Sequence, residues 1–102
     1  MDRITALNDV LTQNPNDAFA RYGLAMECAN SGDAPAADEQ FKSLLATHPN
    51  YVAGYFQYGQ FLAKSGRVAD ARATLSTGIA TALRTGDDHA RSEMEAALAE
   101  LG

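Results

Sequence analysis

The sequence predicts an all-α fold of about six antiparallel helices, and three observations support this prediction. Apolar residues recur every three or four positions through most of the 102 residues, which is the period of an α-helix. No segment shows the sustained alternation of apolar and polar residues that is typical of a half-buried β-strand. Gly, Pro and Asp fall between the periodic segments, where helices begin and end. We therefore expect one domain over residues 1–102, with short loops.

The first two helices are separated by an Asn-Pro-Asn-Asp turn. Residues 1–14 are amphipathic, and the proline that follows drives its preceding residue out of the helical region. Asn16 or Asp17 is expected to cap a second helix, which runs to about Asn30 before Gly32 ends it in the left-handed conformation. The predicted apolar stripe of the first helix is Ile4, Leu7, Val10 and Leu11.

The third and fourth helices are separated by the His48-Pro49 turn. Asp33 caps the third helix, whose expected stripe is Ala37, Phe41, Leu44 and Leu45. Residues 51–66 hold five of the eight aromatic residues and carry no charge before Lys64. A helix that is apolar around so much of its circumference must lie between neighbours. Its two apolar faces are Tyr55, Tyr58, Gly59 and Leu62, and beside them Ala53, Phe56 and Gln60.

The last two helices meet at Gly86. The fifth helix is expected to bury one face consisting of Val68, Ala71, Leu75, Ile79, Ala82 and Leu83. Asp87 or Asp88 is expected to cap the sixth helix. The stripe of the sixth helix is Ala90, Met94, Ala97, Leu98 and Leu101.

An internal repeat of 34 residues organises these helices. Shifting the chain by this period aligns, without gaps, Pro15 with Pro49, Gly32 with Gly66, Ala25 with Gly59, Ala37 with Ala71, and Phe41 with Leu75. Each unit therefore consists of two antiparallel helices, A and then B. Small residues stand where helix axes must approach closely, and stacking buries the apolar face that one helix pair leaves open.

These positions resemble the tetratricopeptide-repeat family, in its small bacterial type with two full repeats and flanking helices. Residues 52–85 match as Tyr55-x2-Tyr58-Gly59-x2-Leu62, Gly66 and Ala71-x3-Leu75. The resemblance implies an α-solenoid, coiled as a right-handed superhelix, with a lone B-type helix (1–14), repeat 1 (16–51), repeat 2 (52–85) and a capping helix (87–102). Repeat 1 departs at Arg21, where the family has a large aromatic residue, and Phe19 or Tyr22 is expected to fill that space. Repeat 2 has Leu83 in place of a closing proline, so its B helix is expected to run a turn longer.

The resemblance also implies a binding surface, because A-helix side chains line the concave face in this family. The candidate groove residues are Phe19, Tyr22, Met26, Asn30, Ala53, Phe56, Gln60 and Lys64. Phe56 is expected to be the exposed anchor for a peptide or an amphipathic helix. Two alternatives remain open: some of these side chains fill the core, or the same apolar surface makes a homodimer. The Lys and Asn residues with which some family members clamp a terminal carboxylate are replaced by Tyr22, Met26 and Gln57.

The net charge bears on the classes of partner, and the single cysteine bears on the cellular compartment. Eight basic against thirteen acidic residues give a net charge of −5, which argues against nucleic acid or an anionic membrane as partner. No apolar run reaches the length of a signal peptide or a membrane span. Because Cys28 is the only cysteine, no internal disulfide forms, and we expect a cytoplasmic protein.

Residues suited to catalysis are nearly absent. Of the two histidines, His48 precedes a proline in a turn, and His89 lies four residues before Glu93. That spacing suits a metal on a helix, but a surface ion pair explains it as well. Cys28 is expected to be a small buried hydrophobic residue. We therefore expect no catalytic residue, no metal and no cofactor, and a non-catalytic scaffold for protein binding.

Overall fold

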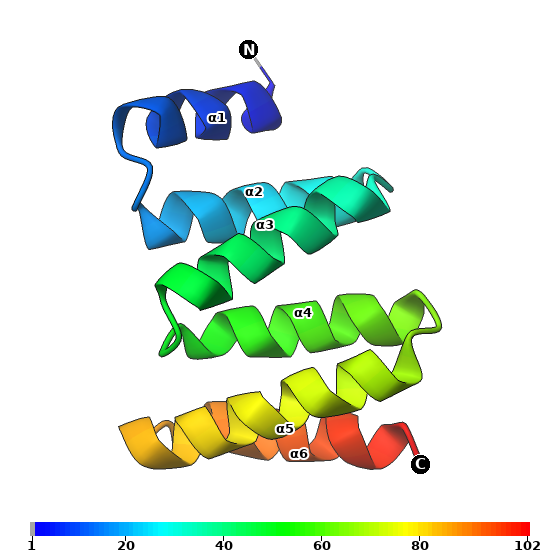
Figure 1. Ribbon diagram of the computed structural model, residues 1–102. Helices are drawn as coiled ribbons and strands as arrows, with labels where there is room; N and C mark the ends of the chain where they lie inside the picture. Colours follow the sequence, from blue (N-terminus) through cyan, green and yellow to red (C-terminus); the bar gives the residue numbers. More distant parts are fainter. Residues whose placement is uncertain (1) are drawn as a thin grey trace. The chain divides into compact units, whose positions relative to one another are not determined.

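Every regular element in the part of the chain that the structure describes is an α-helix. The computed structural model describes residues 2–102, so the predicted helix start at Met1 lies outside the described residues (Figure 1). No strand occurs between Asp2 and Gly102, which confirms the all-α prediction. The helices are α1 (Arg3–Gln13), α2 (Ala18–Asn30), α3 (Ala34–Thr47), α4 (Val52–Lys64), α5 (Val68–Thr85) and α6 (Asp88–Glu100).

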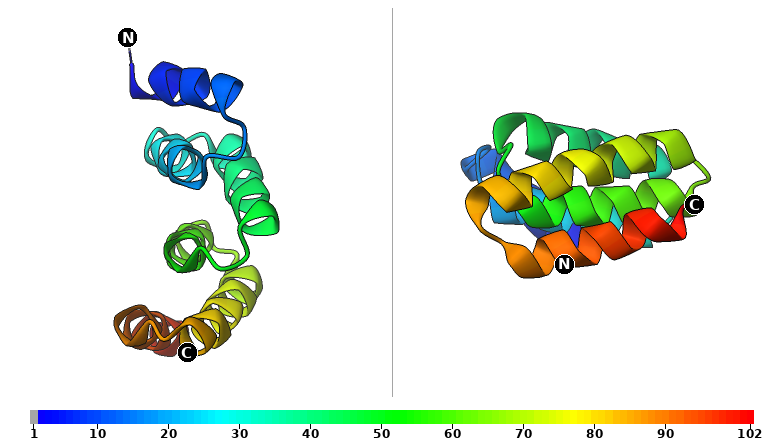
Figure 2. Two further views of the ribbon diagram at one scale, coloured as in Figure 1. Left: turned by 90° about the vertical axis from the view of Figure 1, so that its left-hand side faces the viewer. Right: turned by 90° about the horizontal axis from the view of Figure 1, so that it is seen from below.

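The helices form two compact units, the first ending at Pro49 and the second spanning Asn50–Gly102. In the first unit α2 packs against both α1 and α3. In the second unit α4, α5 and α6 each pack against the other two, and Figures 1 and 2 show these three helices side by side. The boundary lies within two residues of the predicted junction between the repeats.

Four of the six helices begin at an aspartate whose carboxylate accepts a hydrogen bond from the backbone N–H three residues later. Such caps satisfy one of the N–H groups that a helix leaves unpaired at its start. The four capping residues are Asp2, Asp17, Asp33 and Asp87. The bond from Thr5 holds the pKa of the Asp2 carboxyl below its ordinary value. The predicted cap at Asp33 is confirmed, and of the two pairs of alternatives Asp17 and Asp87 are the capping residues.

Three helices end at the predicted glycines. Gly32, Gly66 and Gly86 have φ between 78° and 83°, the left-handed region that a residue with a Cβ rarely adopts. The chain then turns back, and the next backbone N–H reaches the last helical turn, as from Asp87 to the carbonyl of Ala82 at 2.9 Å. The three loops of this kind keep the helices that they join antiparallel.

Small residues stand at the tightest helix crossings, as the repeat predicts. Ala25, Ala37 and Ala71 have no exposed surface. A Cβ at Gly59 would lie 2.6 Å from Cδ2 of Leu75, so α4 and α5 meet at a distance that excludes even a methyl group. The largest fully buried side chains are Phe41, Leu44, Leu62, Leu75 and Met94.

Gly78 of α5 is a contact that the sequence patterns did not indicate. A Cβ there would lie 2.5 Å from Sδ of Met94 in α6 and 2.6 Å from Cβ of Tyr55 in α4. The 34-residue period places Gly78 at the position of Leu44 in α3, which is fully buried. In the second unit, Met94 therefore fills the space of the missing side chain, and Gly78 lets all three helices meet.

Part of the predicted buried face of α5 is wrong. Val68 is 40% exposed and Leu83 is 60% exposed. The residues that α5 buries are Ala71, Leu75, Gly78, Thr81 and Ala82. Successive helical residues are rotated by about 100°, so Leu83 turns away from the face on which Ala82 lies. Val10 of α1 is likewise 43% exposed, and only Leu11 of that predicted stripe is fully buried.

The expectation that Phe19 fills the space beside Arg21 is also wrong, because Phe19 is 73% exposed. Arg21 itself bridges the helices. Its Nη1 donates to Oε1 of Gln40 in α3 at 2.6 Å, and its Nη2 donates to the carbonyl of Pro15 at 3.2 Å. The equivalent position of repeat 2 is Tyr55, an aromatic residue. In repeat 1 that position holds Arg21, a charged side chain with two hydrogen-bond partners.

In each unit, the loop that leads into the A helix is hydrogen-bonded to the end of the B helix. In the first unit Nε2 of His48 lies 3.0 Å from the carbonyl oxygen of Asn16. In the second unit Nη2 of Arg84 donates to Oδ1 of Asn50 at 2.6 Å. Arg84 lies in the four residues by which α5 is longer than α3, so the predicted extra turn of α5 is confirmed.

Candidate functional site

The first group of candidate groove residues shares one face of α2. Phe19, Tyr22, Met26 and Asn30 follow one another at intervals of three and four residues, so their side chains form a single stripe. The opposite face of α2 packs inward through Ala20, Gly23, Leu24, Ala25 and Cys28. Phe19 and Asn30 are exposed, and Tyr22 and Met26 are half-buried. The result is a partly exposed apolar surface, with the amide of Asn30 at its C-terminal end.

The second group shares the equivalent face of α4. Ala53, Phe56, Gln60 and Lys64 repeat the same spacing 34 residues later. Ala53 and Lys64 are exposed, and Phe56 and Gln60 are half-buried. This face is smaller and more polar than that of α2, and its last residue is a cation at the helix C-terminus. We call the two stripes the A-helix faces.

The most exposed aromatic residue of the two faces is Phe19, whereas Phe56 was expected to be the exposed one. Phe19 is 73% exposed and is the only exposed aromatic residue among residues 2–102, whereas Phe56 is half-buried. Phe19 lies in the first turn of α2, directly after the capping residue Asp17, where a helix has fewer neighbours. Sequence spacing identified both phenylalanines as equivalent in orientation but did not distinguish their exposure.

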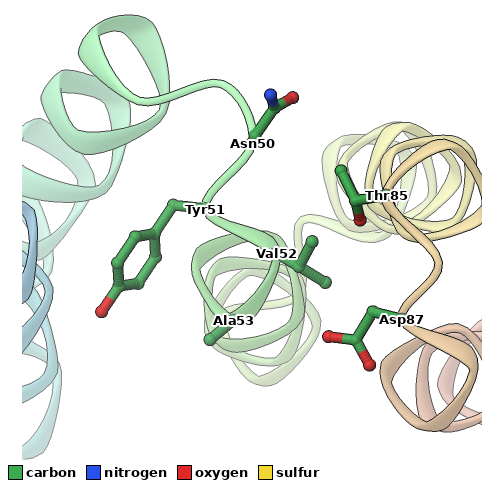
Figure 3. A pocket seen from close by; sticks show the side chains of 6 residues that line it. All are labelled: Asn50, Tyr51, Val52, Ala53, Thr85 and Asp87. Atoms are coloured by element: carbon green, nitrogen blue, oxygen red, sulfur yellow. The ribbon is translucent and has the colours of Figure 1, made fainter.

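A separate surface pocket of about 380 Å³ lies at the N-terminus of α4 (Figure 3). The lining residues are Asn50, Tyr51, Val52, Ala53, Thr85 and Asp87. Its polar groups have structural partners, because Asn50 accepts from Arg84 and the Asp87 carboxylate accepts from the N–H of Ala90 at 3.1 Å. Of the candidate groove residues, this pocket includes only Ala53.

The residues considered for chemistry have structural surroundings. Cys28 is buried, and this burial, followed by the charges of Asp33 and Glu27, raises the pKa of its thiol. A thiol with a raised pKa remains protonated and unreactive at neutral pH. Nε2 of His89 lies 3.2 Å from Oε1 of Glu93 on the exposed side of α6. No cluster of three or more metal-ligating side chains occurs within residues 2–102.

Comparison with known proteins agrees with the repeat geometry. A family model described as tetratricopeptide repeat matches residues 29–101, which is well over half of the chain. The chain belongs to the tetratricopeptide-repeat family. A TPR repeat-containing protein of Pseudomonas aeruginosa is 33% identical over 98 residues, covering 96% of this chain and 93% of that protein.

Two solved structures are similar to this tetratricopeptide-repeat protein. The solution structure of a tetratricopeptide repeat domain protein from Salinibacter ruber has a TM-score of 0.81 and 33% identity, covering 86% of this chain and 89% of that one. The solution structure of a Bordetella parapertussis protein has a TM-score of 0.85 and 25% identity, covering 99% and 88%. These likenesses support the fold, and the family supports a protein-interaction module in general.

The length and apolar character of the helices can be compared with those that a membrane-spanning helix needs. Among the residues that the structure describes, no helix is both long enough and apolar enough to cross a bilayer. The longest helix, α5, carries Asp70, Arg72 and Arg84 along its 18 residues.

Proposed function

We propose that this tetratricopeptide-repeat protein is a non-catalytic interaction module that binds an apolar peptide or an amphipathic helix on its A-helix faces. The exposure of Phe19 beside Tyr22 and Met26 supports this proposal most directly. An aromatic ring that is 73% exposed leaves apolar surface in water, and covering it on binding is favourable. Methionine adapts its shape to different apolar side chains, which suits a binding surface.

Each of the two A-helix faces suits a different group of a ligand. The α2 face offers an aromatic ring and Met26 to apolar side chains of the ligand. The α4 face offers the amide of Gln60 and the ammonium group of Lys64, which suit a polar or acidic end. We propose that this binding takes place in the cytoplasm, because a single cysteine suits a reducing compartment.

Substitution of Phe19 tests the proposal. Phe19→Glu places a charge where the ligand must exclude water, and we expect at least a tenfold loss of affinity, which corresponds to about 1.4 kcal/mol. The melting temperature should stay unchanged, because Phe19 supports little of the core. The measurement is affinity capture from lysate with quantitative mass spectrometry, followed by titration of the captured partner.

Val10→Glu is the matched control, since Val10 is an exposed apolar residue of α1 that lies outside both faces. It should capture the same partner as the unmodified protein. Capture that survives both Phe19→Glu and Phe56→Glu would exclude the A-helix faces. The alternative use of these faces, as a homodimer contact, predicts instead that light scattering shows a dimer that Phe19→Glu dissociates.

A further inference from the structure

The outer face of α5 differs from the outer face of α3 at equivalent positions. We define the outer face of α5 by five exposed residues: Ala69, Ala73, Ser76, Ala80 and Leu83. The 34-residue period aligns them with Pro35, Glu39, Lys42, Ala46 and Pro49 in the first repeat. The first repeat thus has charged residues and prolines where the second has an uncharged, mostly apolar surface with a leucine that is 60% exposed.

The spacing of this face is that of a helix-pairing seam. Its residues are separated by four, three, four and three positions, the interval that keeps a seam directed at one partner helix. Alanine and serine let two helix axes approach to about 8 Å, the lower end of the usual range. The four-residue extension of α5 contributes Leu83 to the seam and places Arg84 beside it.

The charged residues beside the seam would form ion pairs with a second α5 helix in one direction only. Asp70 and Arg84 are 14 residues apart and flank the seam on the same side, with Thr77 midway between them. In an antiparallel pair of α5 helices centred near Thr77, Asp70 of each copy faces Arg84 of the other. In a parallel pair Asp70 of one copy and Arg84 of the other would lie 14 positions apart along the seam, so neither would meet its opposite charge.

Both charged groups retain hydrogen-bonding capacity for this contact. The two bonds from Arg67 end on Oδ2 of Asp70, at 3.0 and 3.1 Å, which leaves Oδ1 to accept from a partner. Arg84 uses Nη2 for its bond to Asn50, which leaves Nη1 and Nε to donate. The Asp70 side chain is 59% exposed.

We propose that a second copy of this chain binds antiparallel along the outer face of α5. In this arrangement Ala73 packs against Leu83 of the second copy, and Ser76 packs against Ala80. The contact is the same patch on both copies, as a two-fold interface requires. It lies on the B helix of repeat 2, so it is distinct from the A-helix faces and leaves them available for a ligand.

Charge reversal tests the partner and the direction together. Asp70→Arg sets Arg against Arg at both ends of the dimer, and Arg84→Asp sets Asp against Asp, so each variant alone should associate at least about tenfold more weakly. An equimolar mixture of the two variants restores both ion pairs and should dimerise. The measurement is sedimentation equilibrium up to about 1 mM protein, because a single helix pair makes a small and therefore weak interface.

Two further variants separate this contact from other causes. Ala80→Glu puts a charge into the seam without touching the bond between Arg84 and Asn50, and it should also weaken the dimer while the melting temperature stays the same. Asp9→Arg, a charge reversal on α1, should leave association unchanged. A protein that is monomeric throughout the concentration range, a mixture that fails to dimerise, or a dimer that Phe19→Glu dissociates would each overturn the proposal.

Discussion

At Gly78, the absence of one side chain determines how three helices meet. The position aligns with Leu44 of the first repeat, which is fully buried, so a glycine here would leave a gap in the core if no other side chain filled it. The structure shows instead that Met94 of α6 enters the space, with Tyr55 of α4 on its other side. Sequence periodicity does not reveal this exchange, because the atom that replaces the missing side chain comes from another helix.

Gly78→Ala should therefore lower the free energy of unfolding. Alanine favours a helix over glycine by about 1 kcal/mol, so a change without packing strain would stabilise. Here the new Cβ would lie 2.6 Å from Cβ of Tyr55, an atom fixed to the α4 backbone, and the helices must separate. We expect a net loss of about 1–3 kcal/mol in chemical denaturation.

Gly23→Ala is the matched control for this substitution. Gly23 is also buried within a helix, but its added Cβ would meet the flexible ends of side chains, with Cδ2 of Leu7 nearest at 3.3 Å and Nη2 of Arg3 at 3.9 Å. The Leu7 side chain can move by a few tenths of an ångström. We expect a neutral or stabilising effect, and an equal destabilisation by both variants would contradict the three-helix junction at Gly78.

The sequence predicted where the helices begin and end more accurately than it predicted which side chains they bury. The ends of the helices are set by local chemistry: aspartate carboxylates bind N–H groups at the start, and left-handed glycines end the turn. Which residues a helix buries depends on its neighbours, and this is where the prediction for α5 failed at Val68 and Leu83. The same dependence explains why spacing placed Phe19 and Phe56 on the A-helix faces without ranking their exposure.

The cap at Asp17 is a direct test of this local control. Its Oδ1 accepts from the N–H of Ala20 at 2.9 Å, and it precedes the helix that carries the α2 face. Asp17→Ala should lower the free energy of unfolding by about 1 kcal/mol, measured by urea denaturation, whereas Asp17→Asn should retain most of the cap. If Asp17→Ala and Asp17→Asn had equal stability, the side-chain hydrogen bond to the N–H of Ala20 would contribute nothing.

At the scale of the whole molecule, the repeat was predictable because it depends on identities at fixed intervals, and the family comparison confirms it. The fold and the family do not specify the partner, so the partner must be inferred from the residues on the surface. That surface has two unlike regions within one chain: the A-helix faces, which include the exposed Phe19, and the outer face of α5, which has lost the charges that α3 carries. We propose that the first region binds a ligand and that the second mediates self-association.

The most direct test of ligand binding at the A-helix faces is NMR mapping of the backbone amides during titration with a partner captured by the unmodified protein. The account predicts that shifts concentrate on α2 around Phe19, Tyr22 and Met26 and on α4 around Phe56 and Gln60. Shifts confined to α3 and α5, with the amides of α2 and α4 unaffected, would contradict it.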